Sequence, residues 1–437
     1  MRISASYKSL AIVAGLLACS NSYAQEHKSQ NGGEHAHTAP AEAKMVDGGL
    51  RYEDEKHMKN IKQLTYGGDN AEAYFGLDGK AIIFQRTNPK EGIDCDQIFY
   101  GKLPKTMKDS FTYTRISSGK GRTTCAYIMP DGKHVVYAST HLGGEACPPV
   151  PDRKVLKKYV WPIYDSYDIF VADLKGNITQ QLTNEPGYDG EATISPKKDK
   201  ILFTSMRNGD LDLYTMDMDG KNVKQITKDL GYDGGAWFSP DGKKIVWRAS
   251  RPKTEEEVKE YTDLLKQGMV APTNMEVFIA DADGSNVQQV TKLGKANWAP
   301  NFTADGKRII FASNHEYERG FPFNMYLINF DGTGLEKISH DGGFDAFPMF
   351  SPDGKKLIFS SNRNNATLAT SCIPGRSNAS VAINIDMVNP MPAIMPMPNK
   401  CRQLIPMGSS AMPAFTARVL KTIMPNGLPK ASPLNMP

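Results

Sequence analysis

The sequence lacks several features that would assign a function directly. Only six of its 437 residues are cysteine, and no two of them have the Cys-x-x-Cys spacing of a metal or thiol-redox motif. It has no Gly-x-Ser-x-Gly turn and no His-Glu-x-x-His motif, which excludes a serine hydrolase of the nucleophile-elbow type and a zincin. Beyond the N-terminus it has no apolar run of about eighteen residues, so we expect no membrane-spanning helix.

A basic stripe is also missing. The formal net charge is +4, but the first 24 residues contribute two positive charges, and residues 365–437 contain six basic residues and one acidic residue. The remaining residues, 25–364, therefore carry about −3. Without a concentrated basic surface, nucleic acid is not an expected partner.

The N-terminus has the pattern of a secretory signal peptide. Arg2 and Lys8 precede the apolar run Leu10–Ala18, and small residues at Ser22 and Ala24 offer a cleavage site. We predict a signal peptide at residues 1–24 and a polar linker at 25–59. The alternative is a lipoprotein signal with a lipid anchor at Cys19. The protein is thus expected to be periplasmic or secreted, or else a membrane-anchored lipoprotein.

Two phrases alternate along the chain. The first is an apolar strand, an x-Pro-Asp-Gly turn and a second apolar strand, because proline presets φ in such a turn and glycine accepts positive φ. Its six copies begin at Tyr74, Tyr127, Thr193, Trp237, Asn301 and Met349, and the third has lost the Asp-Gly, so its turn is expected to differ. The second phrase is an apolar strand, a turn and a more polar strand, and its five copies begin at Gln97, Asp168, Asp212, Glu276 and Asn324.

Together the phrases give four antiparallel strands in about 43 residues, which is typical of a propeller blade. Six first phrases and five second phrases leave one outer strand missing, and Asn60–Thr65 ("NIKQLT") resembles the end of the second phrase. We therefore predict an all-β fold at residues 60–364, a six-bladed β-propeller of four-stranded antiparallel blades closed by this N-terminal strand.

The consensus sequence of the repeat resembles that of a known family. The pattern Ser-Pro-Asp-Gly-Lys-Lys-Ile-x-Phe-x-Ser-x-Arg, followed by Asp-Ile/Leu-Phe/Tyr-x-x-Asp-x-x-Gly and Leu-Thr, resembles the TolB-type, WD-like propeller repeat of bacterial envelope proteins. The resemblance covers residues 60–364. The short stretch Gln25–Asn60 has no room for the α/β domain that precedes the TolB propeller, so the chain looks like a propeller-only relative. Because propellers host many activities, the resemblance implies a fold more strongly than a function.

One face of the propeller, termed the top face, is the predicted functional face. It carries the loops that enter each first strand and three long insertions, His141–Tyr167, Arg251–Met275 and Asn314–Met325, the second of which contains a predicted short helix starting at Thr254. The entering loops supply the candidate binding residues Asp69, Glu72, Asp189, Glu191, Asp233, Trp298 and Asp345. A ring of carboxylates there suits Ca²⁺ or a cationic group, and the aromatic residues suit a sugar or a peptide. The alternative is structural: the acids cap backbone N–H groups, and the aromatics and insertions pack against neighbouring blades.

Three cysteines of the propeller region are disulfide candidates. Cys95, Cys125 and Cys147 allow three pairings, and an exported protein is expected to form one of them. We favour Cys125 with Cys147, because both lie in the second blade.

No catalytic set is evident, and no metal or other cofactor is predicted apart from the Ca²⁺ just considered. We therefore expect a non-enzymatic binding module that recognises an envelope protein, a peptide or a glycan through the top face. The alternative is a lyase or hydrolase that acts on a carbohydrate at the channel mouth.

The composition changes abruptly at the C-terminus. Residues 365–437 contain one acidic residue, one aromatic residue, eight methionines and eleven prolines. So many prolines oppose both helix and central strand. We predict a low-complexity, mostly disordered tail, in which Val381–Met387 is the stretch able to fill the vacant strand of the last blade. Its expected origin is a frameshift in the gene or in its sequencing, and the alternative is a genuine tail.

Overall fold

A computed structural model describes residues 45–46, 50–106, 108–318, 320, 322–363 and 380–384. The predicted signal peptide, Cys19 and all of the predicted disordered tail except residues 380–384 lie outside this part of the chain. No helix in the described residues has the length and apolar character needed to span a bilayer.

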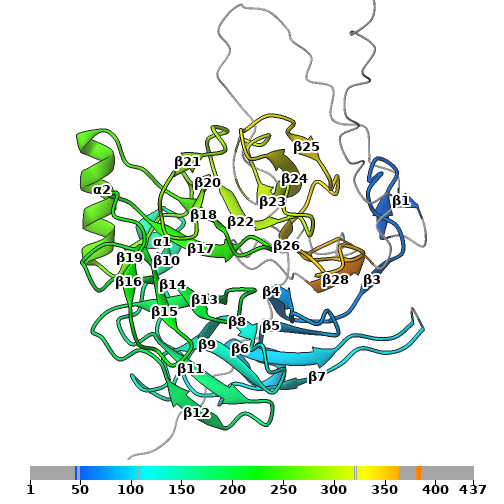
Figure 1. Ribbon diagram of the computed structural model, residues 1–437, viewed down its shortest axis with the longest axis horizontal. Helices are drawn as coiled ribbons and strands as arrows, with labels where there is room; N and C mark the ends of the chain where they lie inside the picture. Colours follow the sequence, from blue (N-terminus) through cyan, green and yellow to red (C-terminus); the bar gives the residue numbers. More distant parts are fainter. Residues whose placement is uncertain are drawn as a thin grey trace, which may run out of the picture. The chain divides into compact units, whose positions relative to one another are not determined.

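Four-stranded antiparallel sheets dominate the described residues, and their innermost strands face a common centre (Figure 1). Blade 1 contains β4 (Asp69–Phe75), β5 (Ala81–Asn88), β6 (Ile93–Lys102) and β7 (Thr112–Arg115), with a 3-10 turn at Pro89–Glu91. Blade 2 contains β8 (Thr123–Ile128), β9 (His134–Ser139), β11 (Asp168–Asp173) and β12 (Ile178–Gln181). Blade 3 contains β13 (Asp189–Ile194), β14 (Lys200–Ser205), β15 (Asp212–Asp217) and β16 (Lys224–Gln225).

Blades 4 and 5 repeat this order. Blade 4 contains β17 (Asp233–Phe238), β18 (Lys244–Ala249), β20 (Glu276–Asp281) and β21 (Gln288–Gln289). Blade 5 contains β22 (Asn297–Phe302), β23 (Arg308–Ser313), β24 (Asn324–Asn329) and β25 (Glu336–Lys337). The prediction of an all-β propeller of antiparallel four-stranded blades is confirmed.

One further sheet draws its strands from both ends of the described chain. This composite sheet has the order β26 (Asp345–Phe350), β27 (Leu357–Ser361), β28 (Ser380–Asn384) and β3 (Ile61–Gln63). β28 pairs antiparallel with β27 and with β3, so it takes the place predicted for Val381–Met387. β26 and β27 also contact β4 of blade 1.

The repeated turn has the predicted hydrogen bonds. In the fourth copy, the amide of Gly242 donates to the carbonyl of Ser239 at 2.8 Å, and Gly242 has φ 65°. The third copy lacks this glycine, yet the amide of Lys198 donates to Ser195 in the same way at 2.8 Å, with φ 65° at Lys198. The expectation of a different turn there is wrong, because lysine adopts the left-handed conformation at the cost of some backbone strain.

The N-terminal segment is more than a polar linker. β1 (Met45–Val46) pairs with β2 (Arg51–Tyr52), and Glu55 and Met58 are both fully buried. The predicted linker 25–59 is therefore wrong for its last residues, which pack against the propeller.

The insertions of blades 2 and 4 meet on the top face. β10 (Trp161–Pro162) pairs with β19 (Met269–Val270), and we term this small sheet the cap. The blade 2 insertion also holds the short helix α1 (Arg153–Leu156), and the blade 4 insertion holds α2 (Glu255–Lys266). As predicted, α2 starts with a capping box between Thr254 and Glu257.

Candidate functional site

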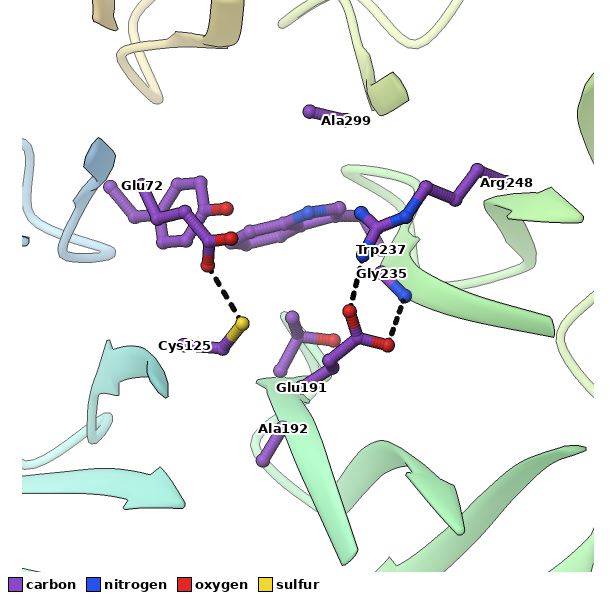
Figure 2. A pocket seen from close by; sticks show the side chains of 10 residues that line it. Glu72, Cys125, Glu191, Ala192, Gly235, Trp237, Arg248 and Ala299 are labelled. Atoms are coloured by element: carbon purple, nitrogen blue, oxygen red, sulfur yellow. Dashed lines mark hydrogen bonds and ion pairs between the residues drawn. The ribbon is translucent and has the colours of Figure 1, made fainter. Parts of the chain in front are cut away.

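The inner strands share one backbone feature that shapes the channel between them. In each of them the ladder to the second strand shifts register at a residue with positive φ. These six residues are Glu72, Cys125, Glu191, Gly235, Ala299 and Phe347. The bulge re-aims this position, and the first five of these residues line one small pocket in the channel (Figure 2). Five of the six are not glycine, so the backbone strain is retained in every one of these sheets except blade 4.

Glu191 ties blade 3 to blade 4. Its carboxylate accepts hydrogen bonds from the Tyr232 hydroxyl at 2.9 and 2.8 Å and from the Gly235 amide at 3.0 Å, and it forms an ion pair with Arg248. Thr204 of blade 3 donates a further bond at 2.8 Å. Glu191 and Arg248 are both buried, so each charge depends on the other.

Two consecutive glycines make room for this network. A Cβ atom at Gly234 would lie 2.2 Å from a Glu191 oxygen, and one at Gly235 would lie 2.2 Å from Arg248 Nη1. The Gly-Gly pair of blade 4 is thus required by the close approach of the ion pair to the backbone.

A second polar contact joins blades 1 and 2 across the channel. The thiol of Cys125 donates to the carboxylate of Glu72 at 2.7 Å, while Arg248 meets Glu191 elsewhere in the pocket (Figure 2). Burial raises the pKa of Glu72 to about 7, even though the Cys125 hydrogen bond opposes that shift. Burial likewise raises the pKa of the Cys125 thiol well above its usual value, so this thiol is not an activated nucleophile.

Aromatic rings close the channel next to these polar groups. The Trp237 ring lies 4.7 Å from the Tyr74 ring and 5.4 Å from the Tyr127 ring, measured between centroids. The pocket that remains has a volume of about 20 Å³, which is enough for about one water molecule. A sugar ring does not fit without movement of these side chains.

The cap covers the top end of the same channel. The Trp161 ring lies 5.1 Å from the Arg248 guanidinium carbon and 5.2 Å from the Trp298 ring. Trp298 is buried, stacks on Phe323 at 4.5 Å and donates its indole N–H to the Pro272 carbonyl at 2.8 Å. The expectation that Trp298 offers a free stacking surface is wrong and its structural alternative holds, because all three insertions contribute side chains or backbone that bury Trp298 in a top-face core.

The predicted ring of carboxylates is buried and paired with arginines. Asp189 accepts two bonds from Arg207, both at 3.1 Å, and Asp233 accepts one from Arg251 at 2.7 Å. Asp345 accepts one from Arg363 at 2.7 Å. Each arginine follows the second strand of the same blade, so the expected open acidic ring is wrong for these three residues. No group of three or more His, Cys, Asp or Glu side chains in the described residues is arranged to hold a metal ion.

Asp69 differs from the other predicted acids. Its neighbour Asn70 pairs with Arg86 in the β4–β5 ladder, at the register that Asp189 and Ser205 occupy in blade 3. The repeat-equivalent residue in blade 1 is therefore Asn70, and Asp69 lies one position earlier. The two aspartates are not equivalent because "GGDNAEAY" has two residues between its aspartate and its glutamate, whereas "GYDGEAT" has one.

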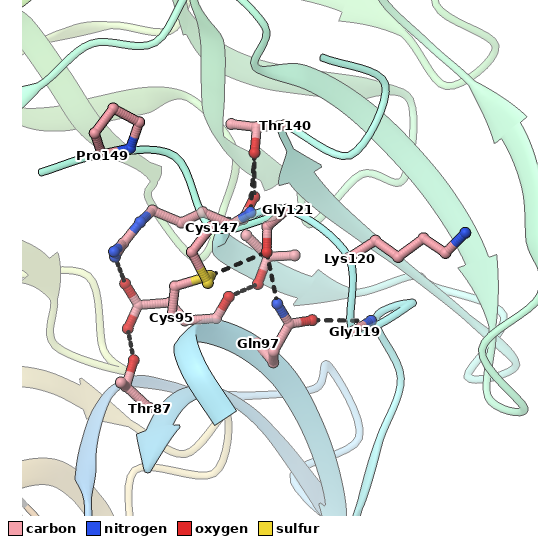
Figure 3. Close-up of a disulfide and its surroundings, with 12 residues drawn as sticks. Thr87, Cys95, Gln97, Gly119, Lys120, Gly121, Thr140, Cys147 and Pro149 are labelled. Atoms are coloured by element: carbon pink, nitrogen blue, oxygen red, sulfur yellow. Dashed lines mark hydrogen bonds and ion pairs between the residues drawn. A yellow bond between two sulfur atoms is a disulfide. The ribbon is translucent and has the colours of Figure 1, made fainter. Parts of the chain in front are cut away.

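The disulfide joins blade 1 to the blade 2 insertion (Figure 3). Cys95 on β6 is bonded to Cys147, and Cys125 is a free thiol. The predicted Cys125–Cys147 pair is wrong, because the bulge of β8 directs Cys125 to Glu72 in the channel.

Part of the chain matches a known protein family. The family model of the TolB beta propeller domain matches residues 160–267 and 269–368, whereas no curated protein matches the sequence. Among solved structures, TolB from Acinetobacter baumannii has 19% identity and a TM-score of 0.44, with 63% of this chain and 56% of that chain covered. The present chain thus spans little more than half of that protein.

Two other solved structures have similar scores. A putative TolB from Agrobacterium tumefaciens has 16% identity and a TM-score of 0.45, with 75% of this chain and 97% of that chain covered. An oligogalacturonate lyase from Vibrio parahaemolyticus has 14% identity and a TM-score of 0.43, with 74% and 79% covered. Scores this low carry no argument about activity or partner. Residues 160–267 and 269–368 therefore match the TolB beta propeller domain, and the repeated four-stranded antiparallel blades agree with that match.

Proposed function

We propose that the chain is a non-enzymatic binding module that recognises an envelope protein, a peptide or a glycan through the blade 2 insertion on its top face. The observation that carries this proposal is a group of exposed apolar side chains within this one insertion. Leu142, Val150 and Val155 have exposed fractions of 62%, 62% and 76%. Single exposed apolar residues are common on any protein, but three within fourteen residues of a tethered loop favour a binding surface.

The insertion is fixed to the propeller, which lowers the entropic cost of binding. The Cys95–Cys147 disulfide fastens its first half to blade 1, and β10 fastens its second half to the cap. Lys158 also forms an ion pair with Glu260 on α2. A partner would therefore meet a surface that is already ordered.

The test is capture of a partner from envelope extracts with the full chain as bait. Leu142→Ser/Val150→Ser/Val155→Ser should capture the partner much less well than the wild type. The matched control is Ile178→Ser/Val223→Ser/Val287→Ser, which changes three exposed apolar residues in different blades, with exposed fractions of 38%, 40% and 49%. Equal capture by both triple variants would count against the proposal.

The second candidate is a lyase or hydrolase acting on a carbohydrate at the channel mouth. It rests on Glu72, whose pKa of about 7 suits a general acid or base at neutral pH, and it requires that the side chains closing the channel move to admit a sugar ring. Turnover of an acidic oligosaccharide by the wild type, lost in Glu72→Gln, would establish this function in place of binding alone. We propose that no cofactor is needed, and calorimetric titration with Ca²⁺ should give no heat of binding.

We also propose that the composite sheet is the sixth blade and that β3 closes the ring. The pairing of β28 with β3 and the contacts of β26 and β27 with β4 support this. Such closure would remove the exposed edges of the first and last blades.

We infer export to the periplasm or the medium from the N-terminal pattern and from the disulfide, which persists in oxidising compartments. The alternative is a lipoprotein anchored through Cys19. The mass of the mature N-terminus distinguishes cleavage after Ala24 from lipidation of Cys19.

A further inference from the structure

We propose that the top end of the composite sheet holds a second binding site, a socket around Arg363 for a carboxylate-bearing peptide segment, which residues 50–58 of the chain fill in cis. We term these residues the strap. The inference is independent of the blade 2 surface, because the two sites share no residue.

The strap binds Arg363 as a peptide ligand would. Glu55 accepts from Arg363 Nη1 at 3.1 Å and from Nη2 at 2.9 Å, which is a two-point carboxylate contact. Arg363 Nη1 also donates to the Leu50 carbonyl at 2.7 Å, and the Tyr52 ring lies 5.7 Å from the guanidinium carbon. The socket therefore binds a carboxylate, a backbone carbonyl and an aromatic ring that all belong to one short segment.

The propeller supplies the rest of the socket. The amide of His340 donates to Glu55 at 3.2 Å. Arg363 is held in place by Asp345 at 2.7 Å and by Ser361, which accepts from its Nε at 3.0 Å. Because these groups belong to the composite sheet and its entering loop, the socket is expected to persist when the strap leaves.

Repeat-equivalent arginines provide an internal comparison. Arg207 in blade 3 and Arg251 in blade 4 pair with the acid of their own blade, as Arg363 does with Asp345. Among these three, Arg363 alone also binds a carboxylate from a segment distant in sequence, since 308 residues separate it from Glu55. The repeat accounts for the Asp–Arg pair, and Arg251 has a second carboxylate at 3.8 Å in the nearby Asp229. Neither accounts for a carboxylate that comes from the strap.

The charge balance lowers the net gain from docking of the strap. Glu55 and Asp345 share one guanidinium, and Asp341 lies in the same buried cluster. Burial, together with the charge of Asp345, raises the pKa of Asp341 to about 7, and burial also raises the pKa of Glu55. Docking of the strap therefore costs more than its hydrogen bonds indicate, so an external segment with further contacts can compete with it, despite the high local concentration of the tethered strap.

The test uses the full chain and a fluorescent peptide with the strap sequence Leu-Arg-Tyr-Glu-Asp-Glu-Lys-His-Met. Glu55→Ala removes the carboxylate that fills the socket in cis, so this variant should bind the peptide at least about tenfold more tightly than the wild type, measured by fluorescence anisotropy. The same peptide with glutamine at the position of Glu55 should not bind. Hydrogen exchange should become faster in the strap of the variant and stay unchanged in β17 and β18.

Several outcomes would overturn the inference. One is a folded Glu55→Ala chain, with normal exchange in β17 and β18, that binds no peptide. A second is equal binding of the glutamate and glutamine peptides, which would show that Arg363 is not the contact. Glu55→Gln is the milder variant if Glu55→Ala does not fold, and failure of both to fold would show that the strap is an obligatory part of the propeller.

Discussion

Replacing Glu191 by glutamine should destabilise the propeller strongly, although the two side chains have almost the same size. The change leaves the Arg248 charge buried without its counter-charge, while Arg248 Nε already lacks a hydrogen-bond partner. Removing one member of a buried ion pair typically costs about 3–5 kcal/mol. With an unfolding entropy of about 2.1 cal/mol/K per residue, each kcal/mol corresponds to about 1.5–2 °C in Tm for a domain of this size, so we expect a loss of roughly 5–10 °C.

The measurement is a double-mutant cycle by thermal and urea unfolding, followed by circular dichroism. Arg248→Met removes the other charge, and Glu191→Gln/Arg248→Met removes both. Because the double variant leaves no unpaired charge, its loss of free energy of unfolding should be smaller than the sum of the two single losses. Glu145→Gln, which breaks an exposed pair with Lys120, is the control and should leave Tm nearly unchanged.

Two results would contradict a coupled Glu191–Arg248 pair. One is a free energy of unfolding for Glu191→Gln within about 1 kcal/mol of the wild type. The other is strict additivity in the cycle, which would show that Glu191 and Arg248 contribute separately and that their contact does not join blade 3 to blade 4.

Three further predictions concern other parts of the fold. Cys147→Ser opens a disulfide whose cysteines are 52 residues apart and should lower the free energy of unfolding by about 4 kcal/mol on the chain-entropy model, and an unchanged urea midpoint would contradict this. Deleting residues up to Thr65 removes β3 and should lower Tm by many degrees, whereas a truncated chain that melts like the parent would count against ring closure. Burial raises the pKa of Asp233 to about 7, so the folded state binds more protons than the unfolded state between about pH 4 and 7, and stability should fall as pH rises through that window. Asp233→Asn should flatten this fall, and an unchanged pH profile would exclude Asp233 as its source.

The blades could be predicted because each one repeats the same local rules. Turn residues such as Ser239 and Gly242 fix where one strand ends and the next begins, and the alternation of apolar residues fixes which side is buried. Even β28 could be placed, because five complete copies define the strand that the last one lacks. Lys198 shows that this turn also accepts other residues, since a lysine here takes the left-handed conformation that a glycine has in the other copies.

The channel site could not be predicted in the same way. The contact of Glu72 with Cys125 depends on two bulges that aim side chains from different blades at one another, and no local pattern encodes that direction. For the same reason the predicted disulfide is wrong. Cys95 and Cys147 belong to different blades, and only the packing of blade 1 against the blade 2 insertion brings them together. The sequence nevertheless contained one indication of the channel site. In "DGGAW" the adjacent Gly234 and Gly235 lie within an inner strand, where they leave room for Glu191 and Arg248.

Comparison among the blades therefore separates structural residues from candidates for function. The buried aspartates recur with an arginine in three sheets, so the fold alone explains them, and their charge is no evidence for a ligand. Arg248 occupies a position where blades 2 and 5 have Ala138 and Ala312. Glu72, Cys125 and Glu191 occupy the bulge position, where blades 4 and 5 have Gly235 and Ala299. A residue that the repeat does not require, and that costs energy to bury, needs another reason to be there. For that reason the search for a ligand should begin at the residues that depart from the repeat. These are Arg248 and Cys125 in the channel, the disulfide-bound insertion and the strap. The acids that recur in the repeat are a poorer starting point.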